Sequence, residues 1–125
     1  MGRISKFLCP SCNKSWQTTL GHGIDHAVLE NILDIFPPEI QKSILSDIEG
    51  GQIPAFEFNY RPAVCTRCRK VLSVPVIYLH RTKKTYSSVC PDCGNDVTIQ
   101  SEDEKLICPH CQNSALSVED IGIWD

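Results

Sequence analysis

The spacing of the cysteines constrains this chain more than any other feature. All eight cysteines fall into four C-x-x-C pairs, and none is left over. The pairs are Cys9/Cys12, Cys65/Cys68, Cys90/Cys93 and Cys108/Cys111. This spacing places two thiols on one tight turn, a knuckle, whose backbone N–H groups can point at the sulfur atoms. Two knuckles together supply four sulfur ligands at about 2.3 Å around a tetrahedral Zn2+ ion. We therefore predict two four-thiolate sites that hold two Zn2+ ions.

Disulfides and redox chemistry explain the cysteines less well. Residues 1–6 lack the apolar stretch of a secretory signal, and Lys6 stands where a myristoylation signal has Ser or Thr. No apolar run in the chain approaches the roughly 18 residues that cross a membrane. We therefore expect a cytoplasmic protein without membrane contact, and disulfides are rare in that compartment. A redox C-x-x-C motif belongs to a βαβ setting, which none of the four pairs has.

Hydrophobic periodicity predicts a helical hairpin over residues 24–50. We expect Asp25 to cap the first helix and Pro37-Pro38 to end it and open the second helix. Gly50-Gly51 is expected to end the second helix. Aliphatic side chains cover most of both helices, which indicates that the hairpin is largely buried.

Alternating and β-branched residues predict short strands around the knuckles. The predicted strands are residues 15–20, a stretch from Ala55 toward Cys65, and residues 71–79, 97–99 and 106–107. Pro75 favours an edge position or a bulge in its strand, because proline has no N–H to donate. Residues 81–84 are expected to turn the chain back through Tyr86.

Three pairings of the four knuckles are possible, and loop length favours one of them. The 14 residues between Cys93 and Cys108 suffice for two short strands and a turn, and Gly94 can adopt the positive φ that often follows a knuckle. One predicted site is therefore Cys90, Cys93, Cys108 and Cys111. By subtraction, the other predicted site is Cys9, Cys12, Cys65 and Cys68, with the helical hairpin between its two halves. Two alternatives stay open. In one, Cys65/Cys68 join Cys90/Cys93 and the end knuckles join each other; the other is an interleaved cross-brace.

Residues 7 to about 86 resemble the CpXC domain, a bacterial family named for its Cys-Pro-x-Cys motifs. The residues that carry the resemblance are Cys9-Pro10-Ser11-Cys12, Ile44-Leu45-Ser46-Asp47, Phe56-Glu57-Phe58, Cys65/Cys68 and residues 74–80. Thr66 departs from the pattern, because it stands where a second Cys-Pro-x-Cys motif has Pro. The resemblance implies a bacterial protein in which Cys9/Cys12 and Cys65/Cys68 share one site, and the family carries no established activity. Residues 87–125 lie outside this resemblance and are similar to generic rubredoxin-like zinc ribbons.

These patterns together predict an α+β protein made of two zinc-ribbon, rubredoxin-like β units. Residues 1–86 form the first unit, which the helical hairpin at about 24–50 interrupts. Residues 87–125 form a short second ribbon and a tail.

A structural role for the metal follows from the ligand set. Four thiolates leave no open position for water or substrate, whereas catalytic zinc keeps one. A rubredoxin-like iron electron carrier is an alternative, since the same ligands hold iron. His22 and His26, with Asp25 and Glu30, would suggest a third metal site, but Gly23 interrupts the helix between the two histidines. No catalytic motif appears, and we predict a non-enzymatic protein.

The charge distribution raises the question of a nucleic-acid partner. The chain has a formal net charge of −3, yet residues 61–86 contain seven of its 12 basic residues and no acidic one. The seven are Arg61, Arg67, Arg69, Lys70, Arg81, Lys83 and Lys84. Clustered Arg and Lys suit phosphate contacts. However, a zinc ion with four thiolates carries a net charge of −2, so some of these residues offset their own site.

The prediction we favour is a small protein-interaction or adaptor module, of unknown biological role, that binds a partner protein. Ile121-Gly122-Ile123-Trp124 in the tail would supply an apolar anchor, because Trp is enriched at binding hot spots. The opposing interpretation is that the tail forms a strand on the protein's own sheet. A nucleic-acid-binding ribbon that uses residues 61–86 is the first alternative function, and the iron electron carrier is the second.

Overall fold

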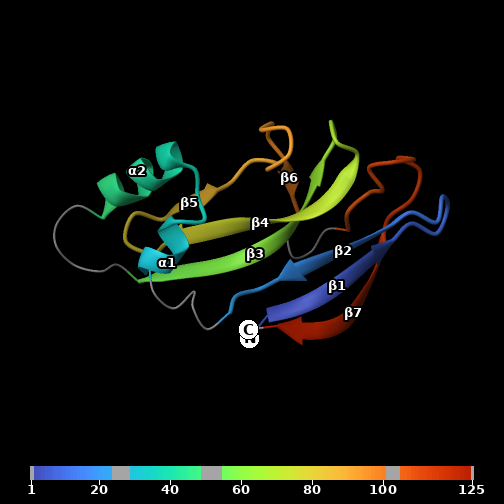
Figure 1. Ribbon diagram of the computed structural model, residues 1–125, viewed down its shortest axis with the longest axis horizontal. Coiled ribbons are helices and arrows are strands. Elements are labelled where there is room, and N and C mark those ends of the chain that lie inside the picture. The colour runs from blue at the N-terminus through green and yellow to red at the C-terminus, as the bar shows by residue number, and fades with distance from the viewer. Residues whose placement is uncertain (1, 24–28, 49–54, 101–104, 125) are drawn as a thin grey trace.

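A computed structural model describes residues 2–23, 29–48, 55–100 and 105–124 of the 125-residue chain. These residues are mostly β and form two antiparallel sheets and two short helices (Figure 1). The terminal sheet has the strand order β2-β1-β7, and the central sheet has the order β5-β4-β3-β6. Among the described residues, no helix has both the length and the apolar character that a membrane span requires.

The terminal sheet joins the two ends of the chain. Strand β1 (Gly2–Leu8) lies in the middle, between β2 (Ser15–Leu20) and β7 (Ser117–Trp124). The strand predicted at 15–20 is confirmed, and the tail forms a strand on the protein's own sheet. Strand β1 was not predicted, because only part of its sequence shows apolar alternation. The two ends of the chain therefore lie close together (Figure 1).

The central sheet is built on one long hairpin. Strand β3 (Phe56–Cys65) pairs along its whole length with β4 (Lys70–Leu79), as the alternation from Ala55 and the β-branched run predicted. Strand β5 (Lys84–Ser87) extends the sheet beyond β4, and the short β6 (Thr98–Ile99) lies on the other side of β3.

Pro75 lies on an internal strand, and the prediction of an edge position was wrong. Its carbonyl accepts a hydrogen bond from the Ser88 N–H at 3.3 Å, so the backbone polar groups of Pro75 face the β5 side of the strand. Strand β5 ends at Ser87, opposite Val76. The missing N–H of Pro75 therefore lies at the very end of the pairing with β5, and it removes no bond to β3.

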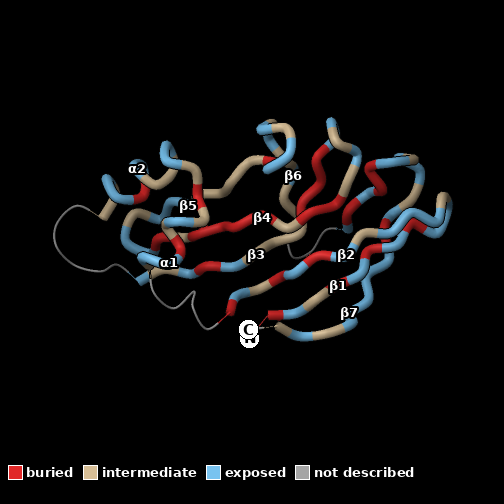
Figure 2. The backbone as a smooth tube through the Cα atoms, in the orientation of Figure 1, coloured by how far each residue is buried: buried red, intermediate tan, exposed pale blue. Residues whose placement is uncertain are grey.

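The helical hairpin packs on one face of the central sheet. Helix α1 (Leu29–Leu33) and helix α2 (Pro38–Asp47) confirm the two predicted helices and the start of the second at Pro38, but α1 ends at Leu33 rather than at Pro37. Their predicted ends at Asp25 and Gly50-Gly51 lie outside the described residues. The helical hairpin contributes Ile32, Ile44 and, from the turn between its helices, Phe36 to a core cluster with the sheet residues Phe58, Ile77 and Leu79. Figure 2 shows buried residues, in red, both on the helical hairpin and on the strands that it covers.

A backbone bridge between described residues connects the two sheets. Gly21, which follows β2, exchanges two backbone hydrogen bonds with Tyr60 of β3, at 2.9 and 2.6 Å. Each sheet contains strands from both sides of the predicted boundary at residues 86 and 87. Because β7 pairs with β1, and β6 pairs with β3, the sheets do not follow the predicted division into residues 1–86 and 87–125.

Candidate metal centres

The four knuckles share one backbone conformation. The residue after each second cysteine has a positive φ, namely Asn13 (62°), Arg69 (54°), Gly94 (73°) and Gln112 (59°). In three of the knuckles its N–H donates to the carbonyl of the first cysteine, at 2.8–3.0 Å. This turn closes each C-x-x-C segment and brings both thiols to the same side. The positive φ predicted for Gly94 is confirmed.

The knuckles also direct backbone N–H groups at the sulfur atoms. The N–H of Cys68 lies 3.4 Å from the Cys65 Sγ, and the N–H of Cys111 lies 3.5 Å from the Cys108 Sγ. Such N–H groups favour the thiolate, which is the form of cysteine that binds metals.

The terminal cysteine group joins the two ends of the described chain. It consists of Cys9, Cys12, Cys108 and Cys111, whose sulfur atoms lie within 4.8 Å of one another. The Sγ atoms of Cys9 and Cys111 are 3.5 Å apart, and those of Cys12 and Cys108 are 3.7 Å apart. The hydroxyl groups of Ser11 and Ser114 contact each other beside this group.

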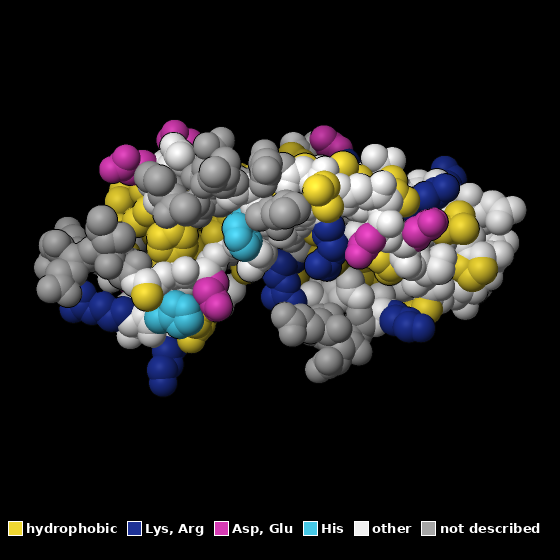
Figure 3. Space-filling view, turned by 90° about the horizontal axis from the view of Figure 1, so that it is seen from below, with side chains coloured by type: hydrophobic (Ala, Val, Ile, Leu, Met, Phe, Trp, Pro, Cys, Tyr) yellow, Lys and Arg dark blue, Asp and Glu magenta, His cyan; other side chains and the backbone are white. Residues whose placement is uncertain are grey.

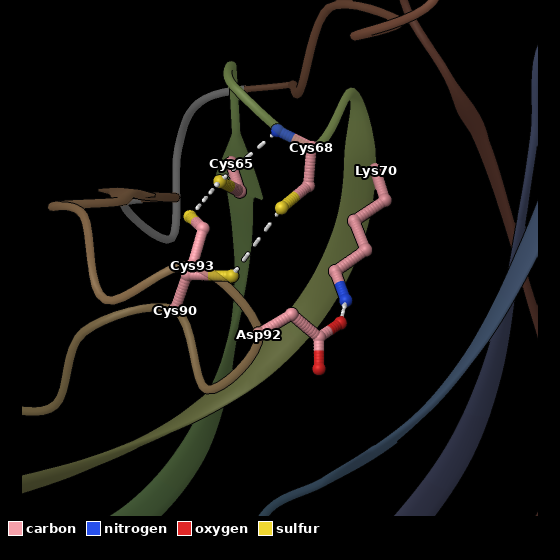
Figure 4. A network of polar contacts seen from close by, with 6 residues as sticks. All are labelled: Cys65, Cys68, Lys70, Cys90, Asp92 and Cys93. Carbon is pink, nitrogen blue, oxygen red and sulfur yellow. Dashed lines mark hydrogen bonds and ion pairs between the residues drawn. The ribbon is translucent and has the colours of Figure 1, made fainter.

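The central cysteine group lies at the end of the long hairpin (Figure 4). It consists of Cys65, Cys68, Cys90 and Cys93, again with all sulfur atoms within 4.8 Å. The Cys65–Cys93 and Cys68–Cys90 sulfur distances are 3.5 and 3.8 Å.

The sulfur distances fit a tetrahedral metal site and exclude disulfides. Four ligands at about 2.3 Å from a central ion stand about 3.8 Å from one another. The observed sulfur separations of 3.5–3.8 Å match this value. A disulfide would need about 2.05 Å, and all eight cysteines are free. Each group could therefore hold a metal ion.

The predicted pairing of the knuckles was wrong, and the arrangement is the alternative that joins consecutive central knuckles. Cys90/Cys93 do not meet Cys108/Cys111, because β6 pairs with β3 rather than with residues 106–107. That pairing places Ile99 opposite Ala63, two residues before Cys65.

Strand pairing also explains why the end knuckles meet. Cys9/Cys12 follow β1, and Cys108/Cys111 precede β7. The antiparallel ladder places Leu8 opposite Ser117, so both knuckles lie at the same end of the terminal sheet. The predicted site of Cys9/Cys12 with Cys65/Cys68 is therefore corrected, together with the same pairing implied by the CpXC resemblance.

Burial differs between the two cysteines of each knuckle. The first cysteine is buried in every case, and the second is partly exposed. Cys9 and Cys108 belong to a core cluster that includes Phe7 of the terminal sheet and Val64 and Val71 of the central sheet. The sulfur donors are thus part of the hydrophobic core rather than attached to its surface.

Neighbouring groups lower the pKa of some of the thiols and raise the pKa of others. The N–H of Cys12 lowers the pKa of the Cys9 thiol to about 6, and the N–H of Asn95 lowers the pKa of Cys93 to about 6. The adjacent thiol of Cys93 and burial raise the pKa of Cys68 to about 12. Four sulfur atoms at contact distance cannot all carry negative charge without a compensating cation. A divalent ion would supply that charge.

Charged residues around the central group partly pair with each other. Lys70 forms an ion pair with Asp92, which lies between Cys90 and Cys93 (Figure 4). Arg67 and Arg69 on the neighbouring knuckle are exposed. The ion pair of Asp92 was not predicted, although its place between Cys90 and Cys93 was a signal.

The seven basic residues of segment 61–86 do not form one patch. Arg67, Arg69 and Lys70 lie at the knuckle end of β4, and Arg81, Lys83 and Lys84 lie beyond its other end. The ten residues of β4 separate the two sets by about 30 Å. Lys84 also pairs with Asp47, at 3.3 Å.

Two of the described histidines, His22 and His80, make ordinary polar contacts. The Nδ1 atom of His22 lies 3.0 Å from the Asn59 Oδ1, and the Nε2 atom of His80 lies 3.7 Å from Glu57. His26 lies outside the described residues. Within the described parts of the chain, the clusters of three or more potential metal ligands are the two cysteine groups.

The tail residue Trp124 is used within the molecule. Its Nε1 donates to the Leu20 carbonyl at 2.9 Å, and its ring lies 6.0 Å from that of Tyr60. Ile121 and Ile123 on the same strand stay exposed, at 45% and 71%.

Comparisons with protein-family models, curated proteins and solved structures gave no match for this chain. The resemblance to the CpXC domain therefore stays a prediction.

Proposed function

We propose that the protein binds two structural Zn2+ ions, one in each cysteine group. The observation that carries this proposal is the set of sulfur separations, 3.5–3.8 Å, in two independent groups of four thiols. All four positions of a tetrahedral ion would be taken by sulfur, which leaves none for a substrate.

Each ion would hold a different part of the fold. An ion in the terminal group ties the knuckle after β1 to the knuckle before β7 and so fixes the ends of the chain. An ion in the central group ties the β3–β4 hairpin to the segment that leads into β6. Structural zinc contributes on the order of 10 kcal/mol to such small domains. That contribution matters because the sheets here are small.

For the biological role, we propose a protein-interaction module. The support is the exposure of Ile121 and Ile123, two large aliphatic side chains of β7. Replacing Ile123 with Ser should then weaken binding to the partner protein without changing the metal content.

Metal content and metal removal test the structural role. Elemental analysis combined with native mass spectrometry should find two zinc ions per chain. A strong chelator should then abolish the near-ultraviolet circular dichroism of the packed aromatic residues, and added Zn2+ should restore it. Two iron atoms per chain, with visible absorbance, would support the electron-carrier alternative. A well-folded protein that contains no stoichiometric metal would contradict the proposal.

A further inference from the structure

A polar cleft lies between the two sheets, and its lining residues include no cysteine. Its volume is about 710 Å3, within the range of roughly 300–1,000 Å3 that ligand sites occupy. Residues of β1 and β7 form one wall, among them Arg3, Phe7 and Val118. The other wall belongs to the central sheet. Figure 3 shows the surface hollowed near the middle of the molecule, with Lys and Arg side chains beside the hollow.

The register of the β3–β4 hairpin explains which side chains face the cleft. Glu57, Asn59 and Arg61 alternate along β3 and share the face opposite the helices, because Phe58 between them packs under the helices. Tyr78 lies directly opposite Glu57 and also lines the cleft. The floor is therefore a set of hydrogen-bonding groups on a rigid hairpin rather than on a loop.

Arg3 and Glu57 of the cleft each lie near a group of opposite or potentially opposite charge, whereas Arg61 does not. The Arg3 Nε lies 3.8 Å from Asp120, and Glu57 lies 3.7 Å from the His80 ring. Arg61 is different, because its Nη2 donates to the backbone carbonyl of Gln100 at 2.7 Å. In the described parts of the chain, no carboxylate lies within ion-pair distance of Arg61. A half-buried guanidinium held by a neutral acceptor keeps its charge available for an anion.

The hydrogen bond to Gln100 also fixes Arg61 in place. The Gln100 N–H donates to the Pro62 carbonyl at 2.9 Å, so the acceptor itself is tied to the strand that carries Arg61. A guanidinium that is already positioned loses less conformational freedom when it binds an anion.

We propose that this cleft binds a small ligand with a carboxylate or phosphate group, which Arg61 contacts directly and Arg3 flanks. Tyr78 and the apolar side chains of Val76 and Val118 would contact the uncharged part of the ligand. A long polyanion fits less well, because the chain has a net charge of −3 and two four-thiolate zinc sites would bring it to about −7. The ligand class goes beyond the structural role of the metal ions and does not depend on it.

Titrations with two simple anions test the proposal. The metal-loaded, 15N-labelled protein is titrated with inorganic phosphate and, separately, with succinate, at constant ionic strength. We expect saturable chemical-shift changes at residues of the cleft, including the side-chain Nε–H of Arg61 and the amide of Asn59. Saturation with phosphate alone or with succinate alone identifies the class of ligand. Linear, unsaturated shifts with both anions would overturn the proposal.

Matched arginine variants distinguish the cleft from general charge effects. Arg61→Gln should weaken binding at least tenfold, and Arg3→Gln should weaken it less. Arg81→Gln removes the same charge from an exposed position beyond the end of β4 and should change the affinity less than twofold. Equal weakening by Arg61→Gln and Arg81→Gln would overturn the proposal. If Arg61→Gln fails to fold, the affinities of Arg3→Gln and Arg81→Gln are compared instead. Equal weakening of binding by these two variants would overturn the proposal.

Discussion

A left-handed residue follows the second cysteine of every knuckle. Only Gly94 adopts this conformation without steric cost, whereas Arg69 and Gln112 carry a Cβ at φ values of 54° and 59°. The conformation is retained at all four sites because the turn must bring two thiols to one side. The strain at Arg69 and Gln112 is thus an expected cost of building the cysteine groups.

Gly94 should therefore tolerate alanine poorly. Gly94→Ala places a Cβ at a φ of 73°, although no atom lies within 4 Å of that position. We expect the free energy of unfolding to fall by about 1 kcal/mol, measured by chemical denaturation of the metal-loaded protein. Gly122→Ala is the control, because Gly122 lies in β7 and its Cβ would meet Ile4 at an ordinary distance of 3.4 Å. Equal effects of the two variants would show that the left-handed conformation is not the cause.

The cysteine donors were fully predictable, and the other knuckle features were not. A C-x-x-C pair is a local pattern, so the sequence states directly which thiols lie on one turn. The left-handed conformation of Arg69 and Gln112 has no such signal, because neither residue type favours it. The spacing of the cysteines therefore predicts the metal ligands, but it does not predict the left-handed backbone conformation at Arg69 and Gln112.

At the scale of single elements, helix α2 is held to strand β5 by Asp47. The carboxylate accepts hydrogen bonds from the Tyr86 hydroxyl and from the Lys84 ammonium. Asp47 lies in the last turn of α2, where the negative end of the helix disfavours a carboxylate. The contacts with β5 offset that disadvantage.

The pKa of Asp47 should report this contact. The Tyr86 hydroxyl, and then Lys84, lower the pKa of Asp47 below its usual value of about 3.9. The ionised form is the one that the fold favours, so its contribution to stability is lost as the pH falls below that value. Tyr86→Phe should raise the pKa of Asp47, and Lys84→Met should raise it less, as followed through the carboxyl 13C shift. Tyr78→Phe serves as the control, and an unchanged pKa in Tyr86→Phe would show that the contact is absent.

Gly2 lies where strands β1 and β7 approach each other closely. It lies opposite Trp124 in the β1–β7 ladder, and a Cβ on Gly2 would collide with the indole ring and lie 2.6 Å from the Leu20 carbonyl. Gly2→Ala should lower the free energy of unfolding by about 1–3 kcal/mol and shift the fluorescence of Trp124, because ring and strand must both move. Unchanged stability and fluorescence would contradict this packing.

The positions of the strands were easier to predict than the way in which the strands pair. Periodicity within residues 15–20 and 71–79 is local, and both strands formed where it predicted them. The partners of β6 and β7 lie far away in sequence, at β3 and β1, and no local pattern specifies them. The tail itself contained the apolar residues of a strand, but the same residues suit a partner anchor equally well.

At the scale of the whole molecule, one cysteine group is nested inside the other. The central group spans residues 65–93, and the terminal group spans residues 9–111 on either side of it. Loop length favoured a ribbon of residues 90–111, because short loops close at lower entropic cost. Long-range strand pairing outweighed that advantage here. The whole-molecule arrangement was therefore the part that the sequence could not determine.

Paired cysteine variants test this nested arrangement most directly. Native mass spectrometry in the presence of a mild chelator should count two metal ions on the unmodified chain. Cys9→Ser with Cys108→Ser damages only the terminal group and should leave one ion per chain. Cys9→Ser with Cys65→Ser damages both groups and should leave none. The reverse result, with one ion retained by the second variant and none by the first, would contradict the nested sites and restore the pairing expected from loop length.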